Sequence, residues 1–550
     1  MKVVIIGGGT AGISTATHLR RKDENARIVV LEKSDEFAVA TCGLPYYLSG
    51  AVTELDDLKG ATQEQMKKIF KIDVKLKHEV VNINRENKKL IIDGGEEESY
   101  DKLVIATGAL QLRPDIPGIL SDNIFTLRNL ESAQRIKDYY LGTGAKKVLI
   151  LGGGDVGVEA AEAMHSLGAE VTIAEAGTHI LKNFDADMTA VLQNHLRNKG
   201  IKLHLNTLVT EFREKEACLN GETLIDFDMA IIATGVKPDV KLPVTADITI
   251  GESGGITVND RMQTNDENIY ACGDNVEILN KLTGKTERLV GSGIAIKQAR
   301  TAAGNIAGLD SRMEAVIGTS IIPIFGMTAA MAGCSEATLK ALQIDYRKIH
   351  LFQRSHASYV PGVKQMLFKL LFSPQGKILG VQGIGEDGIP ERINAIAAMI
   401  KLGASLNDMI NTEIPYAPPY SGAKDAINNL GSLAEELLRQ QVRYVYAEDI
   451  DWTKSGNEIL LIDTRNRESF LNGHIAHAIN IPLAALRDNL GSIPRDKQVI
   501  LYCQYGYGAY NAYWILTQRG FDNVYLLSGS MDLFIEIAAN EESYLPLKQA

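Results

Sequence analysis

Two cysteines stand in settings that suit redox or sulfur chemistry. Cys42 lies in TCGLPYYLSG, directly before a stretch expected to form a helix. Cys503 follows the apolar run QVILY and opens the loop CQYGYG. Helix N-termini and loops with inward-pointing N–H groups stabilise a thiolate, which is the reactive form of the side chain. We therefore predict a reactive thiolate at Cys42, single out Cys503 as a second candidate, and interpret the others, Cys218, Cys272 and Cys334, as packing residues.

Two glycine-rich turns are expected to position the cofactors that such chemistry needs. Each turn joins an apolar strand to a helix and has the spacing GxGxxG, and an acidic residue ends the following strand. This pattern allows a tight turn, close approach of a pyrophosphate and a hydrogen bond to a ribose hydroxyl. No arginine closely follows the second acidic residue, which favours NADH over NADPH. The first set is Gly7, Gly9, Gly12 and Glu32, and the second is Gly152, Gly154, Gly157 and Glu175.

Three further motifs close strands in the same region. LVIATGA and AIIATGV both end in ATG-type turns, and NIYACGDN places Asp274 after a strand and a glycine. In this order the motifs resemble the pyridine nucleotide–disulfide oxidoreductases. The resemblance implies that the first fold binds FAD, with Asp274 on its ribityl chain, and that the second, inserted fold binds NAD(P)H. The remaining implied cofactor-binding residues are Ala106, Thr107, Gly108, Glu159 and Gly235.

The C-terminal region resembles a rhodanese domain. The segments IDTR, with Asp463 and Arg465, and GHIAHAINIP, with His474, frame the Cys503 loop. The resemblance implies a cysteine persulfide that is stabilised by loop N–H groups and by a helix N-terminus. The arginine that usually ends such a loop is replaced by Gly508. We therefore expect a persulfide-carrying domain that uses thiosulfate poorly.

These patterns predict an α/β protein with two nested Rossmann-like dinucleotide-binding domains, an α+β dimerisation domain and a rhodanese-like α/β domain. The dimerisation domain implies a homodimer. The predicted boundaries are 1–112 with 246–320 for FAD, 113–245 for NAD(P)H, 321–440 for dimerisation, 441–457 for a linker and 458–550 for the rhodanese-like domain.

The neighbours of Cys42 narrow the chemistry. Relatives with a disulfide pair have a second cysteine five positions later, where this chain has Tyr47. Single-cysteine NADH oxidases and peroxidases have a histidine in the first glycine turn, where this chain has Thr10. Coenzyme A-disulfide and coenzyme A-persulfide reductases have a CGLPYY-type motif and two arginines at the end of the first helix. Here these are Arg20 and Arg21, whose guanidinium groups suit the phosphates of coenzyme A.

Two segments of the dimerisation domain extend this resemblance. HASYVPG and YAPPYSGAKD look like segments whose tyrosines approach the cysteine of the partner subunit in these reductases. A phenol can protonate a departing thiolate or donate a hydrogen bond to a persulfide. The roles are carried over to Tyr359 and Tyr416 as catalytic residues and to Tyr420 as a substrate-binding residue. Val360 stands where a second adjacent tyrosine often occurs.

Three positions depart from the reductase pattern. Ala38 and Thr41 replace the serine and asparagine that commonly precede the cysteine. Asp155 replaces a bulky aromatic residue in the second glycine turn. Because a carboxylate repels pyrophosphate, the binding of the nicotinamide cofactor is expected to be weaker or to differ.

The composition sets outer limits on function. The chain has 550 residues, a net charge of −11 and five cysteines without a CxxC pair. The net charge argues against a nucleic-acid-binding surface, although it allows a local basic patch for an anionic substrate. The few, unpaired cysteines argue against a disulfide framework. No apolar run approaches the ~20 residues of a membrane span. We expect a cytoplasmic protein that has small-molecule thiol substrates and no nucleic-acid, membrane or metal partner.

The sequence therefore predicts an FAD-dependent enzyme driven by NAD(P)H. It would reduce a coenzyme A persulfide, polysulfide or disulfide through Cys42, with sulfur handling by Cys503. Two alternatives stay open at this point. One is an NADH oxidase or peroxidase that uses a Cys42 sulfenate, and the other is a redox sensor or sulfur-transfer adaptor with low turnover.

Overall fold

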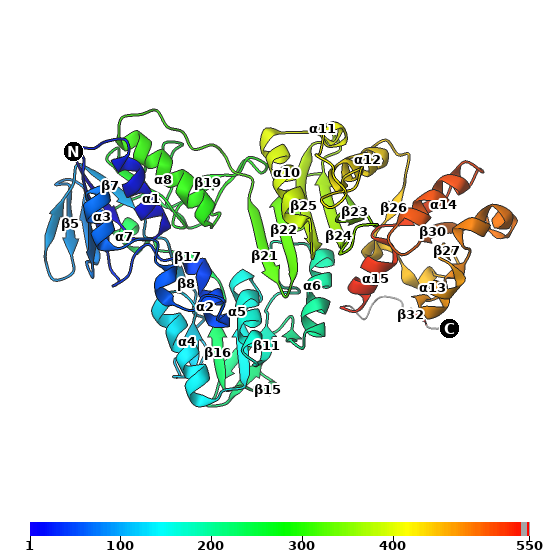
Figure 1. The fold of residues 1–550 in the computed structure, drawn as a ribbon, viewed down its shortest axis with the longest axis horizontal. Coiled ribbons are helices and arrows are strands. Elements are labelled where there is room, and N and C mark those ends of the chain that lie inside the picture. Colours follow the sequence, from blue (N-terminus) through cyan, green and yellow to red (C-terminus); the bar gives the residue numbers. More distant parts are fainter. Residues whose placement is uncertain (541–546, 549–550) are drawn as a thin grey trace. The chain divides into compact units, whose positions relative to one another are not determined.

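The computed structural model describes residues 1–540 and 547–548. The chain divides into two compact units, which are presented separately below (Figure 1). The first comprises Met1–Ala176 and Ile201–Val316, and the second comprises Gly177–Gly200 and the chain from Ile317 onward. Within the described residues, no helix is both long and apolar enough to span a membrane.

The first unit contains a five-stranded parallel sheet with the order β18-β7-β1-β2-β3. Its strands read as apolar runs because both faces of a parallel sheet are usually covered. Helices α1 (Thr10–Arg20) and α8 (Ser292–Ile306) pack against each other and lie together in Figure 1. The strands are β1 (Lys2–Ile6), β2 (Arg27–Glu32), β3 (Ile72–Leu76), β7 (Lys102–Ile105) and β18 (Ile269–Ala271).

A second five-stranded parallel sheet repeats this plan with the order β12-β11-β10-β16-β9. Helix α5 (Asp155–Ser166) follows β10, and the short helix α2 (Leu44–Ser49) of the first fold packs against it. The two nested dinucleotide-binding folds predicted from the glycine motifs are thus confirmed. The strands are β9 (Ile124–Thr126), β10 (Lys147–Leu151), β11 (Glu170–Ala174), β12 (Lys202–His204) and β16 (Met229–Ile232).

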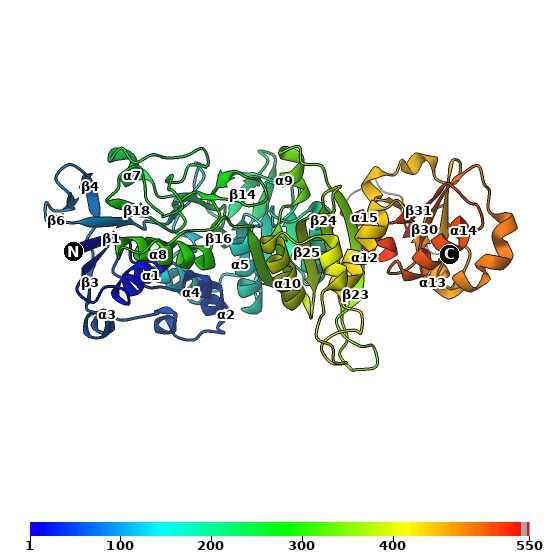
Figure 2. The ribbon, with the colours of Figure 1, turned by 90° about the horizontal axis from the view of Figure 1, so that it is seen from above.

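The second unit begins with an antiparallel sheet of order β21-β22-β25-β24-β23. Helix α10 (Ile389–Leu402) packs on β22 and β25. Helix α12 (Ala426–Leu438) packs on β23, and Figure 2 labels both near each other. This is the predicted α+β domain. Its strands are β21 (Thr319–Ile324), β22 (Met327–Gly333), β23 (Arg347–Arg354), β24 (Gln365–Phe372) and β25 (Ile378–Gly385).

The C-terminal sheet is parallel, with the order β26-β31-β30-β27-β29. Its edge strand β26 (Tyr444–Val445) lies inside the predicted linker 441–457, so this stretch belongs to the C-terminal domain and does not separate two domains. The predicted end of the domain, residue 550, lies outside the described residues. The other strands are β27 (Ile459–Asp463), β29 (Ile479–Asn480), β30 (Gln498–Tyr502) and β31 (Val524–Leu527).

Helix α6 (Ala186–Asn198) differs from its sequence-based assignment. It lies within the predicted NAD(P)H domain 113–245, yet it belongs to the second unit. There it packs against α15 (Ser530–Ala538) of the C-terminal domain. Asn194 donates a 2.6 Å hydrogen bond from Nδ2 to the Glu536 carboxylate. Polar contacts on one face of α6 therefore join elements that are far apart in the sequence.

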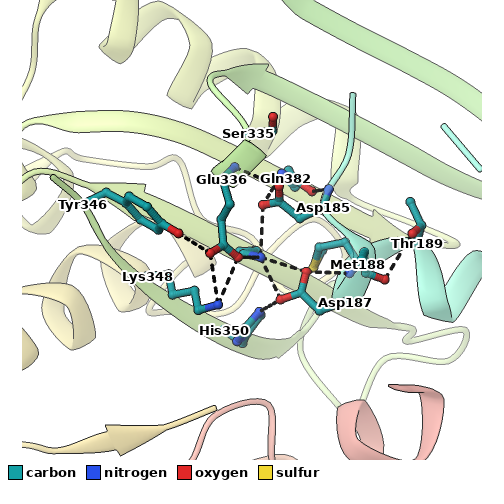
Figure 3. Close-up of polar contacts among 12 residues, drawn as sticks. Asp185, Asp187, Met188, Thr189, Ser335, Glu336, Tyr346, Lys348, His350 and Gln382 are labelled. Atoms are coloured by element: carbon teal, nitrogen blue, oxygen red, sulfur yellow. Dashed lines mark hydrogen bonds and ion pairs between the residues drawn. The ribbon is translucent and has the colours of Figure 1, made fainter. Parts of the chain in front are cut away.

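A buried charge cluster holds the start of α6 against the antiparallel sheet (Figure 3). The fully buried Lys369 ammonium lies 3.0 Å from the Asp185 carboxylate and 2.7 Å from that of Asp187, and it also pairs with Glu336. Carboxylate oxygens of these three residues lie within 4.8 Å of one another, an arrangement that could hold a metal ion. Here the neutralising cation is the lysine side chain.

Charge pairing outweighs burial in this cluster. Burial alone would raise the pKa of Glu336, but Lys369 and Lys348 outweigh it and lower that pKa to about 2. Burial likewise opposes the charge of Lys369, and its three carboxylate partners raise its pKa above the usual value. A group whose pKa is depressed on folding stabilises the fold above its unfolded pKa. The contribution of Glu336 is therefore lost as the pH falls from its ordinary value of 4.5 to about 2.

Removing the central ammonium should destabilise the second unit strongly. Lys369→Met leaves buried carboxylates without their counter-charge, so we expect a loss of about 3–5 kcal/mol in the free energy of unfolding. The matched control is Lys340→Met, because Lys340 pairs with the same Glu336 at 3.6 Å but is 67% exposed. The control should change stability by less than about 1 kcal/mol. Urea unfolding measures both, and equal losses in the two variants would contradict the assigned role of Lys369.

Candidate functional site

The first glycine turn has the geometry of a dinucleotide cradle. Gly7 has a φ of +105°, a conformation that favours glycine. A Cβ on Gly12 would lie 1.9 Å from the Gly7 carbonyl oxygen, so helix and strand approach too closely for any side chain. Gly9 faces open space, which leaves room for a pyrophosphate. The Gly8 N–H donates a 2.6 Å hydrogen bond to Glu32, whose carboxylate therefore lies at the turn.

Neighbouring strand ends complete this site. A Cβ on Gly7 would lie 2.3 Å from the carbonyl oxygen of Ala106, the residue that follows β7. Thr107 accepts a 3.0 Å hydrogen bond from Asn275, whose own Oδ1 is buried without a partner among the described residues. Asp274 accepts a long 3.4 Å hydrogen bond from the Gly291 N–H. The orphaned amide oxygen and the open Gly9 face fit a bound polar cofactor such as FAD.

The second turn repeats the same contacts. Gly152 has a φ of +101°, and a Cβ on Gly157 would lie 1.9 Å from the Gly152 carbonyl oxygen. The Gly153 N–H donates a 2.6 Å hydrogen bond to Glu175. Gly154 faces open space. Gly108 (φ +68°) and Gly235 (φ +97°) close the two ATG-type turns. The second fold therefore fits a dinucleotide by the same physical criteria as the first.

Helix α5 carries carboxylates toward its N-terminal half. Asp155 is its first residue, where the helix dipole favours negative charge. Glu159 is one turn further along and is half-buried. Burial, followed by the charges of Asp155 and Glu162, raises the pKa of Glu159 to about 7. Its protonation therefore changes within the ordinary working range of an enzyme.

Cys42 lies close to this acidic helix. It is exposed, within a short 3-10 turn over Thr41–Gly43 that leads into α2. Burial and then the charges of Glu159, Glu162 and Cys42 raise the pKa of Tyr46, which lies on α2. The turn that holds Cys42 contacts α2, and α2 packs against α5, which carries Glu159. These contacts place Cys42 and Glu159 on neighbouring elements.

Tyr47 occupies the position of a second cysteine and has a packing role. Its side chain is buried, and its hydroxyl donates a 2.5 Å hydrogen bond to Gln134. The Lys137 ammonium lies 4.0 Å from the centre of its ring. Cys272 is also buried, and burial raises the pKa of its thiol to about 11, so it is an inert thiol.

The two predicted phosphate-binding arginines differ sharply. Arg20 is buried, and all five of its N–H groups donate to backbone carbonyl groups, those of Phe70, Asp23, Glu24, Ala26 and Lys71. It therefore has no donor left for a substrate phosphate in this conformation. Arg21 is exposed and ends the same helix, so the predicted phosphate contact can be made only by Arg21 of this pair.

The three tyrosines of the second unit project from two adjacent loops. Tyr359 and Tyr420 are 74% and 77% exposed, and Tyr416 is 49% exposed. The hydroxyl groups of Tyr359 and Tyr416 lie 3.5 Å apart, and this hydrogen bond raises the pKa of Tyr359. A buried ion pair between Arg392 and Asp425 anchors the second loop, because Arg392 also donates to the Tyr420 carbonyl oxygen. The structure thus brings the predicted tyrosines together on an open surface.

The Cys503 loop holds its sulfur against a backbone amide. The Gly506 N–H lies 3.1 Å from Cys503 Sγ, and α14 (Tyr507–Thr517) begins at the next residue. Arg465 pairs with the fully buried Asp463 and donates a 3.0 Å hydrogen bond to the Gln504 side chain. Arg465 therefore links the Cys503 loop, through Gln504, to the buried Asp463 at the end of β27.

Gly508 lies next to the sulfur, whereas the side chain of His474 contacts Phe470. His474 is buried and stacks on Phe470, with 3.8 Å between ring centres. A Cβ on Gly508 would lie 3.5 Å from Cys503 Sγ, so this position is next to the sulfur. Because the residue is glycine, it provides no positive charge there. Tyr505 packs against Phe352 of β23, with 5.7 Å between ring centres. The loop has an amide for a sulfur anion and aromatic neighbours.

Sequence reasoning missed two features near these sites. One is the charge cluster, although Lys369 alone interrupts the apolar strand QMLFKLLF and is the signal that could have found it. The other is Ser530, whose hydroxyl contacts the backbone of Cys503. No local pattern in LSGSMDLF marks that serine, because its role depends on a loop 27 residues earlier.

Two nested dinucleotide-binding folds with an exposed cysteine define the class of this protein as a two-dinucleotide oxidoreductase. The model of the pyridine nucleotide-disulphide oxidoreductases matches residues 1–303, and the model of their dimerisation domain matches 320–426. A rhodanese-like domain matches residues 447–536. The chain therefore belongs to the pyridine nucleotide-disulphide oxidoreductases. This family uses FAD and NAD(P)H.

Individual relatives carry several activity names. The chain is 34% identical to an NADH oxidase of Methanocaldococcus jannaschii, over 80% of this chain and 99% of that protein. It is 33% identical to a CoA-dependent NAD(P)H sulfur oxidoreductase of Pyrococcus furiosus, over 78% of this chain and 97% of that protein.

Two solved structures match nearly the whole chain. One is a reduced CoADR-RHD of Bacillus anthracis, with a TM-score of 0.95, 35% identity and coverage of 99% of each chain. The other is an NAD-dependent persulfide reductase from A. fulgidus, with a TM-score of 0.93, 33% identity and coverage of 97% of this chain and 100% of that chain. The predicted family and its fused C-terminal rhodanese-like domain are confirmed.

The carboxylates of α5 should make use of the nicotinamide cofactor pH-dependent. Below pH about 7 Glu159 is mainly protonated, and above it the residue is mainly ionised. The cofactor is an anion, so the ionised Glu159 should repel it. We therefore expect the KM of the cofactor to rise roughly three- to tenfold as the pH rises through this titration, the effect of a charge interaction of about 1 kcal/mol. Steady-state kinetics between about pH 5.5 and 8.5 measure this profile.

Two variants assign the titration to a residue. Glu159→Gln should remove the step, and Asp155→Asn should move it to lower pH because Asp155 raises the pKa of Glu159. A Glu159→Gln profile that still rises as in the wild type would contradict the assignment.

Proposed function

We propose that this protein is a reductase of coenzyme A persulfides or polysulfides that is driven by NADH through FAD, with coenzyme A disulfide as a second substrate. The observation that carries the proposal is the exposed Cys42 beside α2, which packs against the helix of Glu159, with Tyr47 packed where a second thiol would be needed. The names of the Pyrococcus and A. fulgidus proteins support the substrate class.

FAD, when bound in the first fold, supplies a two-electron carrier between NADH and the thiol. The chain itself supplies binding and orientation. The Gly9 and Gly154 positions leave room for the two pyrophosphates, and Glu32 and Glu175 are directed at the turns where riboses would bind. An acidic residue at position 175 also favours NADH over NADPH.

The sulfur chemistry needs only one thiol. The Cys42 thiolate attacks the outer sulfur of a persulfide R–S–SH, the substrate S–S bond breaks, and RS⁻ leaves while Cys42–S–SH forms. Two electrons from NADH then cleave Cys42–S–SH into the Cys42 thiolate and HS⁻. With coenzyme A disulfide, the same attack forms a mixed disulfide on Cys42 and releases one coenzyme A thiolate.

Substrate binding is assigned to groups that are free to reach solvent. Arg21 is the proposed contact for a phosphate of coenzyme A, since Arg20 is fully committed to backbone carbonyls. Tyr359, Tyr416 and Tyr420 are proposed to face the Cys42 site of a second copy in a homodimer. Their exposure in one chain supports this arrangement, because such large aromatic surfaces are usually covered by a partner.

The C-terminal domain is proposed to carry sulfur on Cys503. The Gly506 N–H would donate to the terminal sulfur anion or to Sγ, in the manner of an anion-binding loop. The lack of a side chain at Gly508 supports poor use of thiosulfate, because this position has no guanidinium group to bind the anionic sulfur donor.

Oxygen reduction is the second candidate, and the name of the Methanocaldococcus relative favours it. That chemistry needs a Cys42 sulfenate or direct reaction of oxygen with the reduced cofactor. Thr10 stands where single-cysteine peroxidases have a histidine, which supports sulfur chemistry instead.

Replacing the first cysteine should abolish turnover. In anaerobic assays with NADH and coenzyme A persulfide, Cys42→Ser should lower the rate at least about 10³-fold, because an unactivated serine hydroxyl is a weak nucleophile and cannot form the S–S bond that is then reduced. The matched control Cys503→Ser should keep the rate within about twofold, since the persulfide is supplied directly. NADH oxidation in air that exceeds the anaerobic persulfide rate would favour the oxidase. Unchanged anaerobic turnover in Cys42→Ser would contradict the proposal.

The tyrosine pair provides a separate test of the dimeric site. Tyr359→Phe combined with Tyr416→Phe removes two phenolic protons at little cost in packing. We expect kcat for persulfide reduction to fall roughly 10- to 100-fold while the KM for NADH stays constant. Stopped-flow kinetics separate the two steps, and light scattering checks that the oligomeric state is unchanged. A loss confined to the NADH half-reaction would contradict the assignment.

A further inference from the structure

The backbone of Cys503 is clamped by a serine from a different element. The Cys503 N–H donates a 2.8 Å hydrogen bond to Ser530 Oγ, and the same hydroxyl donates a 2.8 Å hydrogen bond to the Cys503 carbonyl oxygen. The Met531 N–H also donates to that carbonyl at 3.0 Å. Both polar groups of the Cys503 backbone are thus held by the start of α15.

Ser530 adopts a conformation that serine rarely adopts. Its φ is +55°, and its side chain is fully buried. Glycine adopts this left-handed conformation without steric penalty, whereas a Cβ opposes it. Strained residues that persist in a fold are held by their surroundings and gather at functional sites. The Ser530 hydroxyl offers a compensating interaction, because both of its hydrogen bonds in the described structure go to the backbone of Cys503.

The segment that carries Ser530 is fixed at its other end as well. The Ser528 hydroxyl is hydrogen-bonded to Nδ1 of His350 at 2.8 Å, and Nε2 of His350 lies 2.8 Å from the Asp187 carboxylate. Asp187 is one of the partners of Lys369 in the buried charge cluster. The Ser528 N–H also donates to the Val445 carbonyl oxygen of β26. The clamp on Cys503 therefore starts from a rigid base.

We propose that Ser530 is a positioning residue for sulfur chemistry at Cys503, which deepens the proposed sulfur-carrying function and rests on it. By fixing the N–H and the carbonyl group of Cys503, it sets the direction of the Cα–Cβ bond. The sulfur then stays within reach of the Gly506 N–H, at 3.1 Å. Without the hydroxyl, the Cys503 N–H loses its acceptor and the carbonyl oxygen keeps only the Met531 N–H. The sulfur is then held less firmly at its amide donor, so the thiolate is less favoured.

The substitution Ser530→Gly separates this role from fold stability. Glycine suits a φ of +55°, so relief of strain should offset the lost hydrogen bonds and keep the variant about as stable as the wild type. The Cys503 thiol, however, loses its positioning. The second variant, Ser530→Ala, keeps the strained Cβ and removes only the hydroxyl. The matched control is His477→Gly, because His477 has a φ of +64° in the same domain, is exposed and does not contact Cys503 in the described structure.

The measurement is the pH profile of iodoacetamide alkylation at Cys503 in the full chain, read by mass spectrometry of the peptide that contains it. Ser530→Gly and Ser530→Ala should both lower the rate at pH 7 about fivefold and move the midpoint upward, as expected for the loss of about one hydrogen bond to the thiolate. His477→Gly should alkylate like the wild type. This pattern supports the inference.

Two results would overturn it. One is a wild-type profile in Ser530→Gly. The other is a loss in Ser530→Gly but not in Ser530→Ala, which would assign the effect to glycine flexibility and not to the hydroxyl. Because alkylation needs no sulfur donor, it tests the positioning role apart from the proposed function. An intact Ser530 effect with no sulfur transfer to Cys503 would contradict only the proposed function.

Discussion

The second unit depends on the neutralisation of one buried ammonium group. Lys369 has no exposed side-chain surface, and a charge taken out of water is tolerated only when partners replace its hydration. Its partners come from the start of α6 and from the residue that begins α9 (Glu336–Ala341). The lysine therefore fixes where α6 lies on the antiparallel sheet. Through His350 and Ser528, the same cluster reaches the C-terminal domain and the loop of Cys503.

Local physical requirements explain what could be predicted from the sequence. The glycines of the two turns are needed by the chain itself, since Gly12 and Gly157 lie too close to the preceding turn for any Cβ. Such a requirement appears directly as a spacing of glycines. The assignments that changed depend on long-range pairing instead. Strand β26 has only two residues and therefore no period to detect, and α6 is an ordinary amphipathic helix whose partner surface lies far along the chain.

The candidate site shows the same division. The cysteines, the acidic strand ends and the tyrosine loops were predictable because they stand within recognisable motifs. Arg20 and Arg21 are equivalent as residue types, but successive helix positions point about 100° apart, so one is buried and the other faces solvent. Ser530 could not be predicted, because a serine in a left-handed conformation has no sequence signal and its partner is set by the tertiary fold.

The placement of α6 also determines the order in which the molecule can be completed during synthesis. Asp187 precedes Lys369 by 182 residues, and Asn194 precedes Glu536 by 342. Domains generally fold as they leave the ribosome, N-terminal first. Helix α6 emerges while its partners are still untranslated, so its carboxylates remain hydrated until Lys369 is made, and its contacts with α15 wait until elongation is nearly complete. The native contacts of this helix therefore form among the last in the biogenesis of the chain, and a product that stops before α15 would leave it incompletely partnered.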